Sequence, residues 1–172
     1  MHRHLFFYDI LEGKILYISM KKSILSAPYI MWIIILVGIF IEVYFLPRVF
    51  IFEPSTLAFV FFFITFVYWM YFFIKAITIN PEAPRRPEHI TELVVTGVYQ
   101  LVRHPMYSAD IILAWGVFVA YPLISVFFGV LWLTVVMIVW SYIEEVALIR
   151  KFGDAYISYQ KKTPMFIPKR RR

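Results

Sequence analysis

Four stretches of the chain are almost entirely apolar, and the polar residues gather between them. The stretches cover residues 24–46, 57–79, 106–120 and 123–143. A helix needs about 20 mostly apolar residues to cross a bilayer, so the third stretch is short and the other three are long enough. The pattern predicts an all-α polytopic membrane protein with four transmembrane helices in a single membrane domain.

The last two apolar stretches are separated only by Tyr121 and Pro122, which leaves room for a tight turn and predicts a helical hairpin. The fourth stretch stays helical in pattern as far as Phe152, where basic residues followed by Gly153 predict a helix end. A helix over residues 123–152 is about 45 Å long at 1.5 Å per residue. Because the hydrocarbon core is only about 30 Å thick, we expect residues 144–152 to extend into the cytosol.

The composition excludes a water-soluble domain and a disordered chain. Apolar residues make up 62% of the 172 residues and charged residues 16%, whereas soluble domains carry about a quarter charged residues. The 18 Phe, 12 Tyr and 5 Trp residues are also far too many for a disordered chain. The absence of cysteine excludes disulfides, thiolate metal sites and a cysteine nucleophile, and we expect no metal ion.

The Lys and Arg residues predict the orientation in the membrane, because basic residues favour cytoplasmic loops. They are frequent before residue 24, in the loop 80–105 and after residue 143, whereas the loop 47–56 holds only Arg48. Both termini and the loop 80–105 are therefore predicted to be cytoplasmic. The basic tail Lys169–Arg172 suits attraction to anionic lipid, so we expect the bilayer and not nucleic acid as its partner.

Residues 153–172 are predicted to form a surface lid. Asp154 is expected to cap a short helix that carries Tyr156 and Tyr159 and ends at Thr163–Pro164. The alternation of aromatic and charged residues there is typical of an amphipathic segment at the membrane surface.

Polar residues that the membrane topology does not explain occur in the segment 97–107. Pro105 suits the first position of a helix, which leaves free N–H groups and a partial positive charge at the helix start. Arg103, His104 and two tyrosines lie beside that start, and Gly97 permits a backbone turn before it.

A second polar group is the pair Glu144–Glu145 at the end of the fourth stretch. Neither carboxylate has a basic residue three or four positions further on, so each needs water or a cation from elsewhere. In a hairpin the start of the third span and the end of the fourth are neighbours, which brings both pairs, Arg103–His104 and Glu144–Glu145, together. The sequence thus predicts a charged pocket at the cytoplasmic membrane surface, and we expect Asp110 to face it.

These motifs resemble the isoprenylcysteine carboxyl methyltransferase family, within a wider group that includes phospholipid N-methyltransferases. The resemblance covers roughly the second half of the chain. It is carried by Thr91–Tyr99, Arg103–Tyr107, Glu144–Glu145, Phe152–Tyr156, Tyr159 and Phe166–Pro168.

The resemblance implies an integral-membrane methyltransferase that uses S-adenosyl-L-methionine. It implies a lipophilic acceptor that enters from the bilayer, either an isoprenylcysteine-like carboxylate or a lipid amine. Glu145 would hold the ammonium or ribose of the cofactor, and Arg103 and Glu144 would be catalytic. The other cofactor-binding residues would be Gly97, Val98, Tyr99, His104, Pro105 and Tyr107. Aromatic faces attract a sulfonium, for which Tyr99, Tyr107 and Trp115 are candidates.

Two alternatives stay open at this point. The string Arg103-His104-Pro105-x-Tyr107-x-x-Asp110 is also similar to the C-terminal part of membrane sterol reductases, and Arg85–Arg86 would suit the 2′-phosphate of NADPH. A small non-catalytic membrane scaffold is the third possibility. The molecule that the purified protein binds distinguishes the three: S-adenosylmethionine, NADPH or neither.

Overall fold

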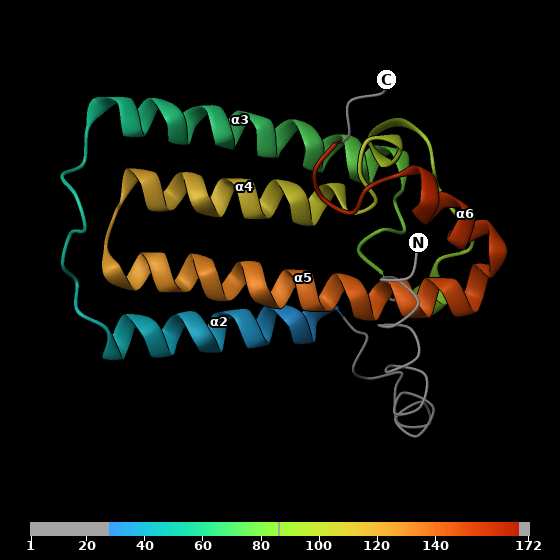
Figure 1. Cartoon of the computed structure of the whole chain (residues 1–172), viewed down its shortest axis with the longest axis horizontal. Coiled ribbons are helices and arrows are strands. Elements are labelled where there is room, and N and C mark those ends of the chain that lie inside the picture. Colours follow the sequence, from blue (N-terminus) through green and yellow to red (C-terminus); the bar gives the residue numbers. More distant parts are fainter. Residues whose placement is uncertain (1–27, 86, 169–172) are drawn as a thin grey trace.

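The computed structural model describes residues 28–85 and 87–168, and the regular elements in these ranges are helices (Figure 1). The predicted all-helical class is therefore confirmed. Four parts of the sequence-based predictions lie outside the described residues. They are the Lys and Arg residues before residue 24, the first residues of the predicted first span, Arg86 and the tail after residue 168. The α-helices are α2 (Pro28–Phe45), α3 (Thr56–Ile79), α4 (Pro105–Ala120), α5 (Ile124–Phe152) and α6 (Asp154–Lys162), with 3₁₀ turns η2 (Pro87–His89) and η3 (Gly97–Gln100).

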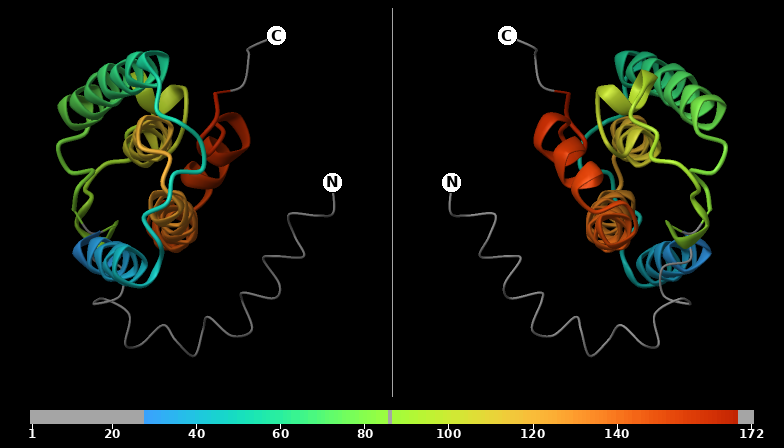
Figure 2. Two further views of the ribbon diagram at one scale, coloured as in Figure 1. Left: turned by 90° about the vertical axis from the view of Figure 1, so that its left-hand side faces the viewer. Right: turned by 90° about the vertical axis from the view of Figure 1, so that its right-hand side faces the viewer.

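The four long helices lie side by side in the order α3, α4, α5, α2 (Figures 1 and 2). Helices α4 and α5 run antiparallel and are joined at residues 121–123. At that end the loop between α2 and α3 pairs with this turn, since the amide of Ile51 donates to Pro122 O and the amide of Ile124 donates to Val49 O. The loop 80–104 and α6 gather at the opposite end of the helices.

Three of the helices, α2, α3 and α5, are long and apolar enough to cross a membrane, whereas α4 is shorter, with 16 residues. Large apolar side chains cover the outside of the bundle. Phe40 and Leu57, for example, are 71% and 79% exposed. Exposure of such a surface to water would be costly, so the helices are those of an integral membrane protein.

Small residues allow the helices to pack closely. A Cβ atom on Gly116 of α4 would lie 2.0 Å from Thr65 Oγ1 of α3, and one on Gly38 of α2 would lie 2.0 Å from Trp132 Nε1 of α5. Such approaches are typical of helix contacts in membranes, where packing replaces the hydrophobic effect between helices.

Two glycines with positive φ shape the polar end of the molecule. Gly97 (φ 60°) begins η3, as the sequence predicted, and a side chain there would meet Ile79. Gly153 (φ 55°) lets α6 begin directly after α5 ends. The expectation that Asp154 caps α6 was wrong: Gly153 is the N-cap, and Asp154 is the first helical residue.

Candidate functional site

A cavity lies at the polar end of the bundle, where α3, α4, α5, α6 and the loop 80–104 meet. It contains about 600 Å³ of empty space, part of it open to solvent. Loop residues from Asn80 to Val94 form one wall, and residues of α4, α5 and α6 form the others.

The loop wall is held in place by Glu82. Its carboxylate accepts hydrogen bonds from the amide and hydroxyl of Thr91, at 2.6 and 2.9 Å, and from Arg85 at 3.1 Å. The bonds from Thr91 lower the pKa of Glu82. The backbone of the loop, which has no long helix, is thereby fixed beside the cavity.

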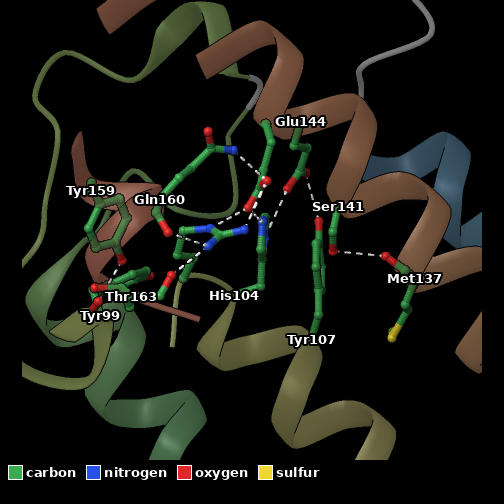
Figure 3. A network of polar contacts seen from close by, with 11 residues as sticks. Tyr99, His104, Tyr107, Met137, Ser141, Glu144, Tyr159, Gln160 and Thr163 are labelled. Carbon is green, nitrogen blue, oxygen red and sulfur yellow. Dashed lines mark hydrogen bonds and ion pairs between the residues drawn. The ribbon is translucent and has the colours of Figure 1, made fainter. Parts of the chain in front are cut away.

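Arg103 joins three parts of the chain at the site, and its backbone partners Gln160 and Thr163 are labelled in Figure 3. Its Nε donates to Glu145 Oε1 at 2.6 Å and its Nη2 donates to Glu145 Oε2 at 3.1 Å. Its Nη1 donates to the backbone oxygens of Gln160 and Thr163. Four of the five N–H groups of a guanidinium are thus engaged within the protein, and the side chain is only 10% exposed.

The backbone next to Arg103 continues this attachment. The amides of Arg103 and His104 donate to the oxygens of Pro164 and Met165, at 2.9 and 3.2 Å. The hydroxyl of Ser108 donates to Phe166 O at 2.9 Å. We call residues 160–166 the C-terminal strap. It lies along the start of α4 and keeps α6 against the cavity.

Glu145 is the centre of the buried polar network. Besides Arg103, it accepts a hydrogen bond from Gln160 Nε2 at 2.7 Å, and His104 Nε2 lies 3.2 Å from it. Its side chain is 6% exposed. The cation beside this carboxylate is therefore Arg103, one of the two basic residues that the hairpin argument placed near it.

Glu144 faces the cavity and has different partners. The Tyr107 hydroxyl donates to Glu144 Oε1 at 2.7 Å, and His104 Nδ1 lies 3.8 Å from Glu144 Oε2. The His104 and Tyr107 rings are stacked at 5.7 Å with an interplanar angle of 7°. One carboxylate oxygen thus has a strong hydrogen bond, and the other lies beside an imidazole.

The start of α4 also faces the cavity. Pro105 is in the first turn, as predicted, and His104 is the N-cap without a side-chain capping bond. Met106 and Tyr107 line the cavity, and within the described residues no acceptor is recorded for their amides. Free N–H groups at a helix start favour a bound anion.

Buried tyrosines complete the wall on the α6 side. The Tyr159 hydroxyl donates to the backbone oxygen of Tyr99, and the rings of Tyr156 and Tyr159 meet edge to face at 5.8 Å. Burial raises the pKa of both hydroxyls, which therefore stay protonated.

The structure brings most of the sequence-predicted site residues to this cavity. Those that line it are Tyr99, Arg103, His104, Pro105, Tyr107 and Glu144. Gly97, Val98 and Glu145 lie behind the lining: Val98 is buried with Ala76 against α3, and Glu145 is enclosed by its partners.

Sequence reasoning missed Gln160 and the strap. Gln160 lies in a helix that was identified only by its tyrosines, and nothing in the spacing pairs it with Glu145. The backbone oxygens of the strap carry no sequence signal at all. Only the tertiary fold reveals them as partners of Arg103.

Two expectations about the site were wrong. Trp115 packs against Phe118 and Phe127, at 5.9 and 6.1 Å, and it does not line the cavity. It lies ten residues along α4 from Pro105, or about 15 Å at 1.5 Å per residue. Asp110 faces α3 instead of the cavity, because the indole of Trp69 donates to its Oδ1 at 2.6 Å.

Asp110 and Trp69 are expected to stabilise the α3–α4 contact as a pair. Asp110→Leu and Trp69→Phe should each lower the melting temperature in detergent, since a polar contact inside a membrane protein is worth about 1 kcal/mol. The double variant should be no less stable than the less stable of the two single variants, because each single substitution already removes the same hydrogen bond. Fully additive losses would show that the two residues act separately.

Parts of the chain are similar to known proteins. A family model described as phospholipid methyltransferase matches residues 55–155. A protein-S-isoprenylcysteine O-methyltransferase B of Arabidopsis thaliana is 35% identical over 92 residues, which cover 49% of this chain and 43% of that protein. A protein-S-isoprenylcysteine O-methyltransferase of Schizosaccharomyces pombe is 36% identical over 90 residues, covering 49% of this chain and 35% of that protein.

The chain belongs to the phospholipid methyltransferase family of membrane methyltransferases. Within it, the chain is similar to the isoprenylcysteine methyltransferases, as the sequence motifs indicated. The match spans less than half the length of either relative.

Proposed function

We propose that the protein transfers a methyl group from S-adenosyl-L-methionine to a lipophilic acceptor at the membrane boundary. The observation that supports this most is the cavity itself. It combines a helix start with free amides, a carboxylate and several aromatic rings at the end of apolar helices. Membership of a methyltransferase family agrees with this reading.

The chemistry of the cavity fits the cofactor. S-adenosylmethionine carries a carboxylate, an ammonium and a sulfonium, together with a nucleoside. The amides of Met106 and Tyr107 suit the carboxylate. The rings of Tyr99 and Tyr107 suit a sulfonium cation.

The proposed cofactor site consists of Tyr99, His104, Pro105 and Tyr107 in contact with the cofactor, with Gly97 and Val98 shaping the wall behind them. Glu145 also belongs to the site. Glu145 already accepts hydrogen bonds from Arg103 and Gln160. We therefore assign it the role of orienting Arg103 and His104, instead of direct contact with the cofactor ammonium.

Bound S-adenosylmethionine supplies an electrophilic methyl group, and the protein has to align the acceptor with it and exclude water. Glu144 is the ionisable side chain of α5 that faces the cavity, so we place it nearest the chemistry. Arg103 lies beside it and keeps the strap and α6 closed over the cavity, which limits the entry of water.

Transfer of label tests this function. Membranes that contain the protein are incubated with S-adenosylmethionine labelled in its methyl group, and the lipids are extracted into organic solvent. We expect label in the lipid extract well above that of membranes with the His104→Ala variant. An unlabelled extract together with NADPH consumption would favour the reductase alternative.

We also propose four membrane spans, with α4 as the short one, and with both termini and the loop 80–105 in the cytoplasm. Because the chain lacks cysteine, single cysteines report exposure without background. Glu53 and Lys161 are exposed, and neither caps a helix. In intact cells an impermeant thiol reagent should label Glu53→Cys and spare Lys161→Cys. Labelling of position 161 but not of position 53 would reverse the topology.

A further inference from the structure

Among the described residues, the indole of Trp140 on α5 is a buried donor without an acceptor. Trp140 is 4% exposed, and its Nε1 makes no hydrogen bond within the part of the chain that the structure describes. The indoles of Trp69 and Trp132 do have acceptors, Asp110 Oδ1 at 2.6 Å and Ile34 O at 3.2 Å. A buried donor without a partner costs about 1–3 kcal/mol, so its presence in the fold calls for an explanation.

Trp140 lies one helical turn before Glu144. Side chains four residues apart share one face of a helix, so the indole and the carboxylate are neighbours on α5. The ring belongs to an apolar cluster with Met31 and Ile35 of α2, and Tyr107 packs against the same cluster from α4. Tyr107 is also the donor to Glu144. Trp140 and Tyr107 therefore approach the same carboxylate from two helices.

Glu144 receives one hydrogen bond from the residues that the structure describes, although its side chain is only 13% exposed. That bond comes from Tyr107, because His104 Nδ1, at 3.8 Å, is too far away to donate. A carboxylate can accept about four. Burial raises the pKa of Glu144, and His104, Tyr107 and Trp140 each oppose this rise. An unpaired donor and an acceptor with free capacity thus lie side by side.

We infer that Trp140 is a positioning residue for methyl transfer, and that its indole N–H donates to the Glu144 carboxylate when the cofactor is bound. The inference rests on the proposed function and adds to it a residue behind the cavity wall. A ligand displaces water from the cavity side of Glu144, so the carboxylate then depends more on donors from the protein. A second donor favours the ionised form and fixes the orientation of the carboxylate.

Other ionisable groups also face Glu144, and they form a constant background for the test. They are Glu92 of the loop, Tyr99 of η3, Arg103 and His104 before α4, Tyr107 of α4, Glu145 of α5 and Tyr156 of α6. All of them stay unchanged when Trp140 is replaced. An effect that is specific to position 140 therefore belongs to the indole.

Two tryptophan substitutions on α5 test the inference against each other. Trp140→Phe and Trp132→Phe each remove one indole N–H, at positions about 12 Å apart along the helix. We expect Trp140→Phe to lower the rate of label transfer to lipid about ten- to a hundredfold, as loss of a bond to a charged group would, with cofactor affinity within about threefold. Trp132→Phe should lower the rate less than about threefold. Equal effects of the two substitutions on the rate would overturn the inference.

The pH profile gives a readout that a purely structural role of Trp140 would not change. Loss of a donor raises the pKa of a carboxylate, and the ionised form is lost as the pH falls through that pKa. The acid limb of the rate profile should therefore move to higher pH in Trp140→Phe and stay in place in Trp132→Phe. An acid limb that stays in place in Trp140→Phe would contradict the inference.

An analogue of tryptophan controls for packing. Benzothienylalanine carries sulfur in place of the indole N–H and keeps the shape of the ring. At position 140 it should reproduce the loss of rate and the shift of the acid limb, while the melting temperature stays the same. A normal rate and a normal pH profile with this analogue would show that the N–H has no part in the reaction.

Nuclear magnetic resonance separates the inference from the proposed function. In protein labelled at the tryptophan indole nitrogens, the Trp140 signal is identified by its loss in Trp140→Phe. S-adenosylhomocysteine should shift this signal downfield, and Glu144→Leu, which removes the acceptor, should prevent the shift. A Trp140 signal that does not move when S-adenosylhomocysteine binds would overturn the inference and leave the proposed function standing. Failure of S-adenosylhomocysteine to bind would contradict the proposed function and the inference with it.

Discussion

Arg103→Lys should destabilise the protein and loosen the cofactor site together. A lysine ammonium keeps the charge, but it cannot meet both oxygens of Glu145 and two strap oxygens at once. Each lost hydrogen bond to a charged group costs about 1.5–3 kcal/mol. We expect the melting temperature to fall by more than about 5 °C. Affinity for S-adenosylmethionine should fall about tenfold or more, since Tyr156 and Tyr159 of the cavity wall depend on the strap.

The matched control is Arg85→Lys. Arg85 also pairs with a glutamate, but its side chain is 59% exposed, and an exposed pair is worth little. This variant should leave both the melting temperature and cofactor affinity unchanged. Limited proteolysis gives a third readout, because release of the strap should expose the chain after residue 162 in Arg103→Lys only. Unchanged melting and proteolysis in Arg103→Lys would show that the strap is held by other contacts.

Glu144→Gln should nearly abolish turnover while it leaves cofactor binding almost intact. Glutamine has the same shape and still accepts a hydrogen bond from Tyr107, but it cannot take up a proton. Loss of a general base typically costs about 10²–10⁴-fold in rate. We expect a loss of that size in methyl transfer to the acceptor, with cofactor affinity within about threefold of the unchanged protein.

Glu92→Gln is the comparison for this variant. Glu92 also lines the cavity but is exposed at its mouth, so its replacement should reduce turnover less than about threefold. Initial rates at saturating acceptor, together with calorimetric titration of the cofactor, measure both effects. If Glu144→Gln weakened cofactor binding about a hundredfold and Glu92→Gln abolished turnover, the roles assigned to the two carboxylates would be exchanged.

The helical elements could be predicted from the sequence because each depends on local patterns. Apolar length defined α3 and α5, Pro105 marked the start of α4, and Gly153 marked the end of α5. The proximity of Arg103–His104 to Glu144–Glu145 also followed, since a hairpin brings the start of α4 and the end of α5 together, whereas the direct pairing of Arg103 with Glu145 did not.

The finer contacts could not be predicted because they depend on helix rotation and on backbone atoms. Asp110 could point to the cavity or to α3, and only the packed helices show that the Trp69 indole donates a hydrogen bond to it. Similarly, adjacent glutamates look alike in sequence. A rotation of about 100° per residue places Glu144 in the cavity and Glu145 in the buried network.

The central claim is that this cavity binds S-adenosylmethionine, and calorimetric titration of the detergent-purified protein tests it most directly. We predict saturable binding of one S-adenosylmethionine per chain and competition by S-adenosylhomocysteine. NADPH should give no heat, and binding should be weakened at least about tenfold in Arg103→Lys. Binding of NADPH, or no binding of S-adenosylmethionine by correctly folded protein, would contradict the account.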